Sequence, residues 1–355
     1  YYDEARRAEG IEQTRAGVAM AERLGSPALL AQSLNAVIVA GKIPDALSIQ
    51  LDAARRLVAL DDDEVPADMR AAGHAHLLRL SLHAGAIDNF AAEVADAVEA
   101  AEQRRDPTIR TLLAWAEATA AFFAGDLNGT EKRALDAAAR HQRTGAWGSI
   151  EALGIHLELC YRELGRLAEI DDTLRSMIGE MAPPAMRLLS AMVAVGQGRI
   201  EVARERFALA PPIVPLDYAW LTYTVNRAYV AAAIDDPEID DLYARLAPYR
   251  SHVVVLDGSF ACYGAVEYYL GLLAQARDGT LAAEHFALAN SVHDRIGARP
   301  WAARSRLALS RVLTRADPDR ATAVLDEIDR VVAGTELDVI RVAAEQVREQ
   351  LSGAR

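Results

Sequence analysis

The chain has 355 residues and a formal net charge of −13, and 52% of its residues are hydrophobic but only 6% are aromatic. The negative charge argues against a surface that grips DNA or RNA phosphates, because such surfaces are strongly basic. No run of 18 apolar residues occurs, so we expect no membrane span, and this length favours two domains or one elongated array over a single globular core.

A turn residue recurs along the chain at a nearly constant interval. The fifth residue after most of these marks begins an apolar face that continues four and seven residues later, as in Phe90, Val94 and Ala97 after Gly85. The first and last marks are 276 residues apart over seven intervals, a mean period of about 39, and such periods indicate a repeat array. The eight marks are Gly41, Gly85, Gly125, Gly165, Gly198, Asp236, Asp278 and Asp317.

The first part of the chain predicts paired helices. Residues 3–24 predict a single helix, so residues 1–27 are assigned to a partial first repeat and residues 28–210 to the N-terminal repeats. The third repeat is expected to contain a helix over 108–124, a turn at Gly125 and a second helix from about 128 to 143. Glycine is suited to this turn because it adopts the left-handed conformation that ends a helix.

Prolines punctuate the chain in a way that predicts helix starts. Proline is favoured in the first helical turn and disfavours helix in the residue before it. The segments expected to begin a helix in this way are 25–27, 65–66, 106–107, 182–184, 210–212 and 297–300.

Residues 211–335 are assigned to the C-terminal repeats and residues 336–355 to a capping helix. The β-branched run Val253–Leu256 is expected to be a helix entry or loop rather than a strand, so the predicted class is all-α. Cys160 and Cys262 each fall in an apolar stretch expected to be helical, and buried, reduced thiols are predicted. The stretch 336–351 is amphipathic, as the end of an array requires.

Helix pairs with a turn glycine and an Ala-to-Phe spacing of four, as in Ala203 and Phe207, resemble tetratricopeptide repeats. The period near 39 resembles the looser repeats of MalT-like regulators. The segment 297–313 (GARPWAARSRLALSRVL) is similar to one found near the end of the repeat arrays in actinobacterial LuxR-type regulators and related STAND-type signalling NTPases. Ala302 and Ala308 depart from that pattern.

The resemblance implies a right-handed α-solenoid of about eight helix-turn-helix repeats that serves as a sensor arm. Such arms adjoin an NTPase module or a DNA-binding helix-turn-helix. Because the sequence begins at Tyr1 without a methionine, we expect a piece of a longer protein. No phosphate-binding loop occurs in these residues, since Gly41-Lys42 lacks the preceding glycine run.

The sequence gives no reason to expect catalysis, a metal or a cofactor. His76 and His83 lie two turns apart on one predicted helix face, and no His-Glu-x-x-His run occurs. No nucleophile elbow is present, because Gly258-Ser259 has the wrong context. The predicted protein is therefore not an enzyme over this segment.

Aromatic and arginine side chains concentrate in the C-terminal repeats. Tyrosine, tryptophan and arginine dominate binding hot spots, and in tetratricopeptide arrays the first helix of each repeat lines a concave groove. Packing inside the repeats is the competing interpretation for each aromatic. The candidate groove residues are Tyr218, Trp220, Tyr223, Asn226, Arg227, Tyr263, Tyr268, Arg299, Trp301 and Arg304.

The leading hypothesis is a non-enzymatic, cytoplasmic sensor that binds a peptide, protein or small-molecule inducer in this groove and transmits its occupancy to neighbouring NTPase or DNA-binding domains. Direct contact with nucleic acid or membrane is not expected, and an oligomer is allowed. The alternative hypothesis is a self-standing scaffold for protein–protein interaction or oligomerisation.

Overall fold

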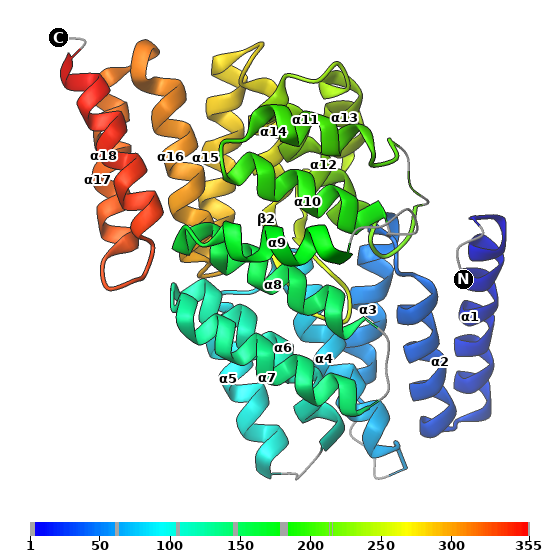
Figure 1. The fold of residues 1–355 in the computed structure, drawn as a ribbon. Helices are drawn as coiled ribbons and strands as arrows, with labels where there is room; N and C mark the ends of the chain where they lie inside the picture. Colours follow the sequence, from blue (N-terminus) through cyan, green and yellow to red (C-terminus); the bar gives the residue numbers. More distant parts are fainter. Residues whose placement is uncertain are drawn as a thin grey trace.

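The computed structural model describes residues 4–60, 64–103, 107–144, 148–177, 184–212, 214 and 216–353. Within these ranges the chain forms 18 α-helices, two 3-10 helices and one two-stranded sheet. Consecutive helices pack against each other along most of the chain (Figure 1). The expected all-α class is confirmed apart from the small sheet. No helix in the described ranges is long and apolar enough to cross a membrane.

The first half of the chain contains nine α-helices and one 3-10 helix. They are α1 (Glu4–Leu24), α2 (Pro27–Ala40), η1 (Pro44–Ala46), α3 (Leu47–Val58), α4 (Ala67–His83), α5 (Phe90–Gln103), α6 (Pro107–Ala124), α7 (Leu127–Arg143), α8 (Ser149–Leu164) and α9 (Leu167–Met177).

The second half contains the remaining elements. They are α10 (Pro184–Gly196), α11 (Ile200–Ala208), α12 (Trp220–Ile234), α13 (Ile239–Leu246), η2 (Ala247–Tyr249), β1 (Val253–Val255), β2 (Cys262–Ala265), α14 (Val266–Ala274), α15 (Gly279–Arg295), α16 (Arg299–Ala316), α17 (Pro318–Val332) and α18 (Asp338–Gly353).

The turn marks act as helix stops and starts, as the sequence predicts. Gly125 has a φ of +78° and separates α6 from α7, which confirms the two helices expected over 108–124 and from about 128 to 143. Two later marks instead cap the start of the following helix. The Asp278 carboxylate accepts hydrogen bonds from backbone N–H groups in the first turn of α15, and the Asp317 carboxylate accepts one in the first turn of α17. A side-chain acceptor at this position stabilises a helix by about 1 kcal/mol.

The expected helix start at residues 210–212 is wrong. The next helix, α12, begins at Trp220, and a connector lies between it and α11. The carbonyl of Pro211 accepts hydrogen bonds from the Tyr223 hydroxyl at 2.7 Å and from Arg227 at 3.3 Å. Side chains of α12 therefore hold this proline segment as a loop instead of extending it into a helix.

The interpretation of Val253–Leu256 as a helix entry or loop is also wrong. β1 pairs antiparallel with β2, with Val253 opposite Ala265 and Val255 opposite Cys262. The signal is an Asp257-Gly258 turn after a β-branched run, a pattern that predicts a hairpin. Cys262 consequently lies in a strand, whereas Cys160 lies in α8 as expected; both thiols are free and buried, and burial raises the pKa of each to about 12.

The hydrophobic core forms two clusters of unequal size. The smaller one joins α1–α4 from Val18 to Leu80, and the larger one extends without a break from Ala71 to Leu351. The larger cluster contains residues on both sides of the expected boundary between the N-terminal and C-terminal repeats at residues 210 and 211.

Some helices of the second half pack back on helices of the first half. α16 packs on α6, α18 packs on α8, and β1 packs on both α4 and α12. The backbone N–H groups of Asn89 and Phe90 donate to the carbonyls of Arg295 and Ile296 at 3.0 and 3.1 Å, which joins the start of α5 to the end of α15. α15–α18 therefore lie beside α5–α8 although they are far away in sequence (Figure 1).

Candidate functional site

The predicted groove residues fall into three groups in the structure. Four lie at the connector before α12 (Tyr218, Trp220, Tyr223 and Arg227), five lie around β2 and α16 (Asn226, Tyr263, Tyr268, Trp301 and Arg304), and Arg299 stands apart. The first and second groups therefore do not form a single groove.

At the connector, the predicted residues mainly hold the protein's own backbone. The Arg227 guanidinium bonds Glu238 at 2.6 and 2.7 Å and lies 4.0 Å from the centre of the Phe207 ring. Trp220 makes an edge contact with Tyr249, whose hydroxyl donates to Asp45 at 2.8 Å. Tyr218 and Trp220 are half-buried, whereas Tyr223 and Arg227 are buried.

Around β2 the aromatic side chains are buried in the core and do not line an open groove. Trp301 is 1% exposed, and its indole N–H donates to the Cys262 carbonyl at 3.0 Å. Tyr268 makes an edge contact with the same ring at 5.7 Å between centroids. Gly264, with a φ of +79°, lies so close that a Cβ there would be 2.8 Å from the indole. Strand and helix therefore touch through a position that only glycine fills without strain.

Arg299 joins three helices near their ends. Its guanidinium donates to the Val331 carbonyl in the last turn of α17, to the Ala333 carbonyl just after that helix, and to the Ala124 carbonyl of α6. These carbonyls have no partner inside their own helices, so the arginine satisfies helix ends that would otherwise need water. Arg299 therefore stabilises helix ends away from the residues around β2.

A central charged cluster lies where α8, α12, β2 and α16 meet. We define it as Glu158, Arg162, Glu163, Asn226, Tyr263 and Arg304. Arg162 pairs with Glu158, and Arg304 pairs with Glu163; the two glutamates are 0% and 1% exposed. Arg162 also lies 5.0 Å from the centre of the Tyr229 ring. Charges this deeply buried persist only when they are paired.

The electrostatics of the cluster keep both arginines charged. Burial disfavours the charged form of Arg162, but the charge and hydrogen bond of Glu158, together with the nearby Tyr229, outweigh burial and raise the pKa of Arg162. Arg304 behaves in the same way beside Glu163. Burial also raises the pKa of Tyr263, whose hydroxyl lies near Asn226 and Glu158, so this phenol stays neutral.

Four buried polar atoms of the cluster have no hydrogen-bond partner among the described residues. They are Oε2 of Glu158, Oε2 of Glu163, Oδ1 of Asn226 and the hydroxyl oxygen of Tyr263. Three of the four only accept hydrogen bonds, so the cluster is suited to a water or another donor.

The carboxylates of this cluster were not among the predicted site residues. The sequence held a usable signal, because Glu158, Arg162 and Glu163 interrupt the otherwise apolar stretch from Leu157 to Leu164. Charges on the buried side of an apolar helix need partners, and Arg304, 141 residues away, supplies one.

A second charged group fixes the hairpin turn to the N-terminal helices. Asp257 pairs with Arg79 of α4 at 3.0 Å and with Lys42. Burial raises the pKa of Asp257, but Arg79 and Lys42 outweigh it and lower the pKa to about 2. His76 bonds Asn35 at 3.2 Å, and burial, followed by Arg79, lowers its pKa to about 4.

Neither charged group has the composition of a metal centre. Within the ranges that the structure describes, no three His, Cys, Asp or Glu side chains gather closely enough to hold a metal ion. Both groups instead join the hairpin and α16 to helices of the first half. Their chemistry is that of desolvated ion pairs that hold two parts of the array in one arrangement.

Comparison of the sequence with known proteins adds no relative: no family model matches it, and no curated protein does.

Proposed function

We propose that this chain is a non-enzymatic sensor module of a bacterial signalling NTPase or transcription regulator, built as a right-handed tetratricopeptide-like solenoid and located in the cytoplasm. It would bind an inducer, peptide or partner protein and transmit that occupancy to neighbouring domains. The repeat period and the 297–313 segment motivate this proposal.

The observation that carries the proposal is the contact of α16 with two helices of the first half. Arg304 of α16 pairs with Glu163 of α8, and Arg299 of the same helix donates to the end of α6. A rotation of the C-terminal helices would have to break or shift these bonds, so the two halves are mechanically linked. A buried pair that is either made or broken is suited to a two-state element, which a sensor requires.

The full-length gene product tests this function. We would measure nucleotide turnover and DNA binding with and without residues 1–355, and again in the Arg304→Gln variant at a temperature where it remains folded. A sensor predicts that both changes alter the basal output. Arg245→Gln is the matched control, because Arg245 forms an exposed pair with Asp241 inside one helix. Identical output from all four proteins would contradict the sensor role.

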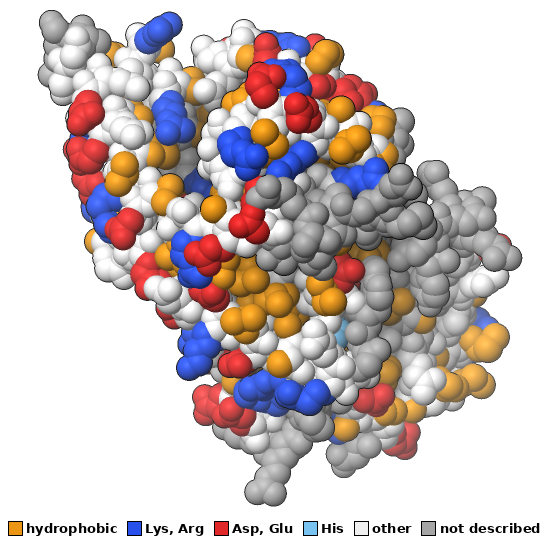
Figure 2. All heavy atoms as spheres, in the orientation of Figure 1, with side chains coloured by type: hydrophobic (Ala, Val, Ile, Leu, Met, Phe, Trp, Pro, Cys, Tyr) orange, Lys and Arg blue, Asp and Glu red, His pale blue; other side chains and the backbone are white. Residues whose placement is uncertain are grey.

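Exposed apolar side chains support the alternative of a scaffold. Leu135 on α7, Ile150 on α8 and Val342 on α18 are 48%, 55% and 59% exposed. Figure 2 shows hydrophobic side chains grouped over the region of α7 and α8. Large exposed apolar patches mark interaction surfaces. Light scattering over a range of concentrations tests this alternative: a monodisperse oligomer that Val342→Asp dissociates would favour it, and a monomer throughout would count against it.

A further inference from the structure

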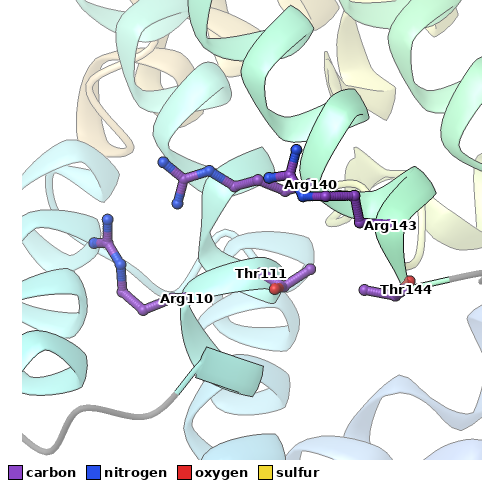
Figure 3. Close-up of a pocket in the computed structure, with 5 residues that line it drawn as sticks. All are labelled: Arg110, Thr111, Arg140, Arg143 and Thr144. Atoms are coloured by element: carbon purple, nitrogen blue, oxygen red, sulfur yellow. The ribbon is translucent and has the colours of Figure 1, made fainter.

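We infer that the opening between the start of α6 and the end of α7 is a binding site for a phosphate group, either as the free ion or on a small phosphorylated molecule. The opening has a volume of about 550 Å³ and is lined by Arg110, Thr111, Arg140, Arg143 and Thr144. Arg140 and Arg143 extend from α7 toward the Arg110 side chain on α6 (Figure 3).

The positive charge of this pocket is largely uncompensated. Across the described residues, Arg140 and Arg143 form no ion pair with a carboxylate, whereas many other arginines do; Arg133 of α7, for example, pairs with Asp126 just before that helix. The chain carries a net charge of −13, so carboxylates are abundant. Basic groups gathered without acidic partners in an acidic protein attract an external anion.

Arg110 contributes an unfilled hydrogen-bond donor. Its Nη1 atom is buried and makes no hydrogen bond, although it lies 3.2 Å from a carboxylate oxygen of Glu102. Glu102 is 62% exposed and offsets part of the charge of Arg110. An oxyanion in the pocket would give this donor an acceptor.

The donor set favours phosphate over a single carboxylate. Three guanidinium groups and one nearby glutamate leave an excess of two positive charges, which a phosphate dianion balances. Guanidinium groups bind phosphate through paired N–H donors. The Thr144 hydroxyl donates to the His141 carbonyl at 2.6 Å, so the arginines supply the donors. The volume exceeds that of a phosphate ion and leaves room for an organic group.

A chain of side-chain contacts connects the pocket to the hairpin. His141, beside Arg140, accepts a hydrogen bond from the Trp115 indole at 3.2 Å, and the Trp115 ring stacks on His156 at 5.1 Å. His156 contacts Thr119 at 3.2 Å, whose hydroxyl donates to the Phe260 carbonyl at 3.0 Å. A ligand in the pocket could therefore shift side chains that contact the hairpin. Phosphate binding itself does not depend on the proposed sensor function.

Calorimetric titration of residues 1–355 with inorganic phosphate tests the site, at constant ionic strength with chloride as the reference ion. Wild type should bind phosphate, and Arg140→Gln combined with Arg143→Gln should weaken binding by about 10-fold or more, since bonds to charged groups are the strong ones. Combining Arg133→Gln with Arg204→Gln removes the same charge at exposed pairs on α7 and α11 and should change the affinity less than about twofold.

Two further arms of the titration complete the test. Arg140→Lys combined with Arg143→Lys keeps the charge but not the paired donors, so the phosphate affinity of this variant should lie between those of wild type and the glutamine variant. Ribose 5-phosphate that binds more tightly than phosphate assigns the site to a phosphorylated metabolite, and the reverse order assigns it to the free ion. No binding by wild type, or equal losses in the two glutamine variants, would overturn the inference. Either result leaves the output measurements on the full-length protein unaffected, so the two proposals fail separately.

Discussion

Arg304 on α16 and Glu163 on α8 form an ion pair across 141 residues of sequence, and the glutamate is the more deeply buried partner. Glu163 is 1% exposed at its side chain, and Arg304 is 17% exposed. Removing one partner therefore has a different effect from removing the other. Without Arg304 the Glu163 carboxylate is a buried charge with no partner, whereas Arg304 keeps some contact with water when Glu163 is neutralised.

Arg304→Gln should lower the free energy of unfolding more than Glu163→Gln. Removing one partner of a buried pair costs about 3–5 kcal/mol when the remaining charge has no other partner. Urea denaturation of both variants measures the difference, with Arg245→Gln as the control at an exposed pair. Equal losses in the two variants would mean that Glu163 is not held as a buried anion.

Gly264→Ala should destabilise the protein more than Gly258→Ala. Both glycines have a φ of +79°, so both substitutions carry a similar backbone cost of about 1–2 kcal/mol. Only at 264 would the new Cβ lie 2.8 Å from Trp301 and 2.9 Å from His293, which adds about 1–3 kcal/mol for overpacking. Thermal unfolding of the two variants measures the effect of the contact between the hairpin and α16. Equal melting temperatures for the two variants would contradict this prediction.

Thr119→Val should cost about 1–3 kcal/mol, because it leaves the buried Phe260 carbonyl without the hydroxyl that α6 supplies. Thr224→Val is the matched control. Thr224 is also buried, but its hydroxyl donates to Trp220 of its own helix at 2.7 Å. Chemical denaturation should therefore show a larger loss for the first variant. Hydrogen exchange of the hairpin amides should rise in that variant alone.

Stability should fall as the pH drops below about 6.5. Burial, followed by Arg306, lowers the pKa of His293 to about 3, and burial lowers that of His156 to about 4. The Ala265 N–H donates to Nε2 of His293 at 2.8 Å, so protonating that atom would break a buried bond. Between pH 6.5 and these lowered values the unfolded chain binds protons that the folded chain does not, and each such histidine contributes a slope of about 1.4 kcal/mol per pH unit.

Urea midpoints at pH 7, 6 and 5 measure this slope. In His293→Gln the amide oxygen can still accept the Ala265 bond but cannot titrate, so its slope should be smaller by about one proton. A midpoint that stays constant from pH 7 to 5 would contradict buried neutral histidines.

Local features of the sequence predicted most of the helices. Gly125 and Asp317 mark helix boundaries because left-handed backbone and side-chain caps are determined by residues within a few positions. The hairpin was missed because three valines are too few for a periodic pattern, although Asp257-Gly258 marked its turn.

The candidate site was less predictable than the fold. Aromatic residues such as Trp301 and Tyr268 lie at helical spacings that are compatible with a groove and with a core. Only the residues around them in the folded protein show which of these two environments they occupy. The structure surrounds both residues with protein. The arginines at 110, 140 and 143 share no motif, since they lie on two helices and only the turn between those helices brings them to one opening.

The helical class and most helix ends follow from local sequence, because propensity, capping and apolar periodicity act over short distances. The tertiary fold brings α16 onto α6, the hairpin loop onto Thr119 of α6, and Arg304 onto Glu163. Those contacts join residues more than a hundred positions apart, and their energy comes from the desolvation and packing of surfaces that do not exist until both parts of the chain have folded.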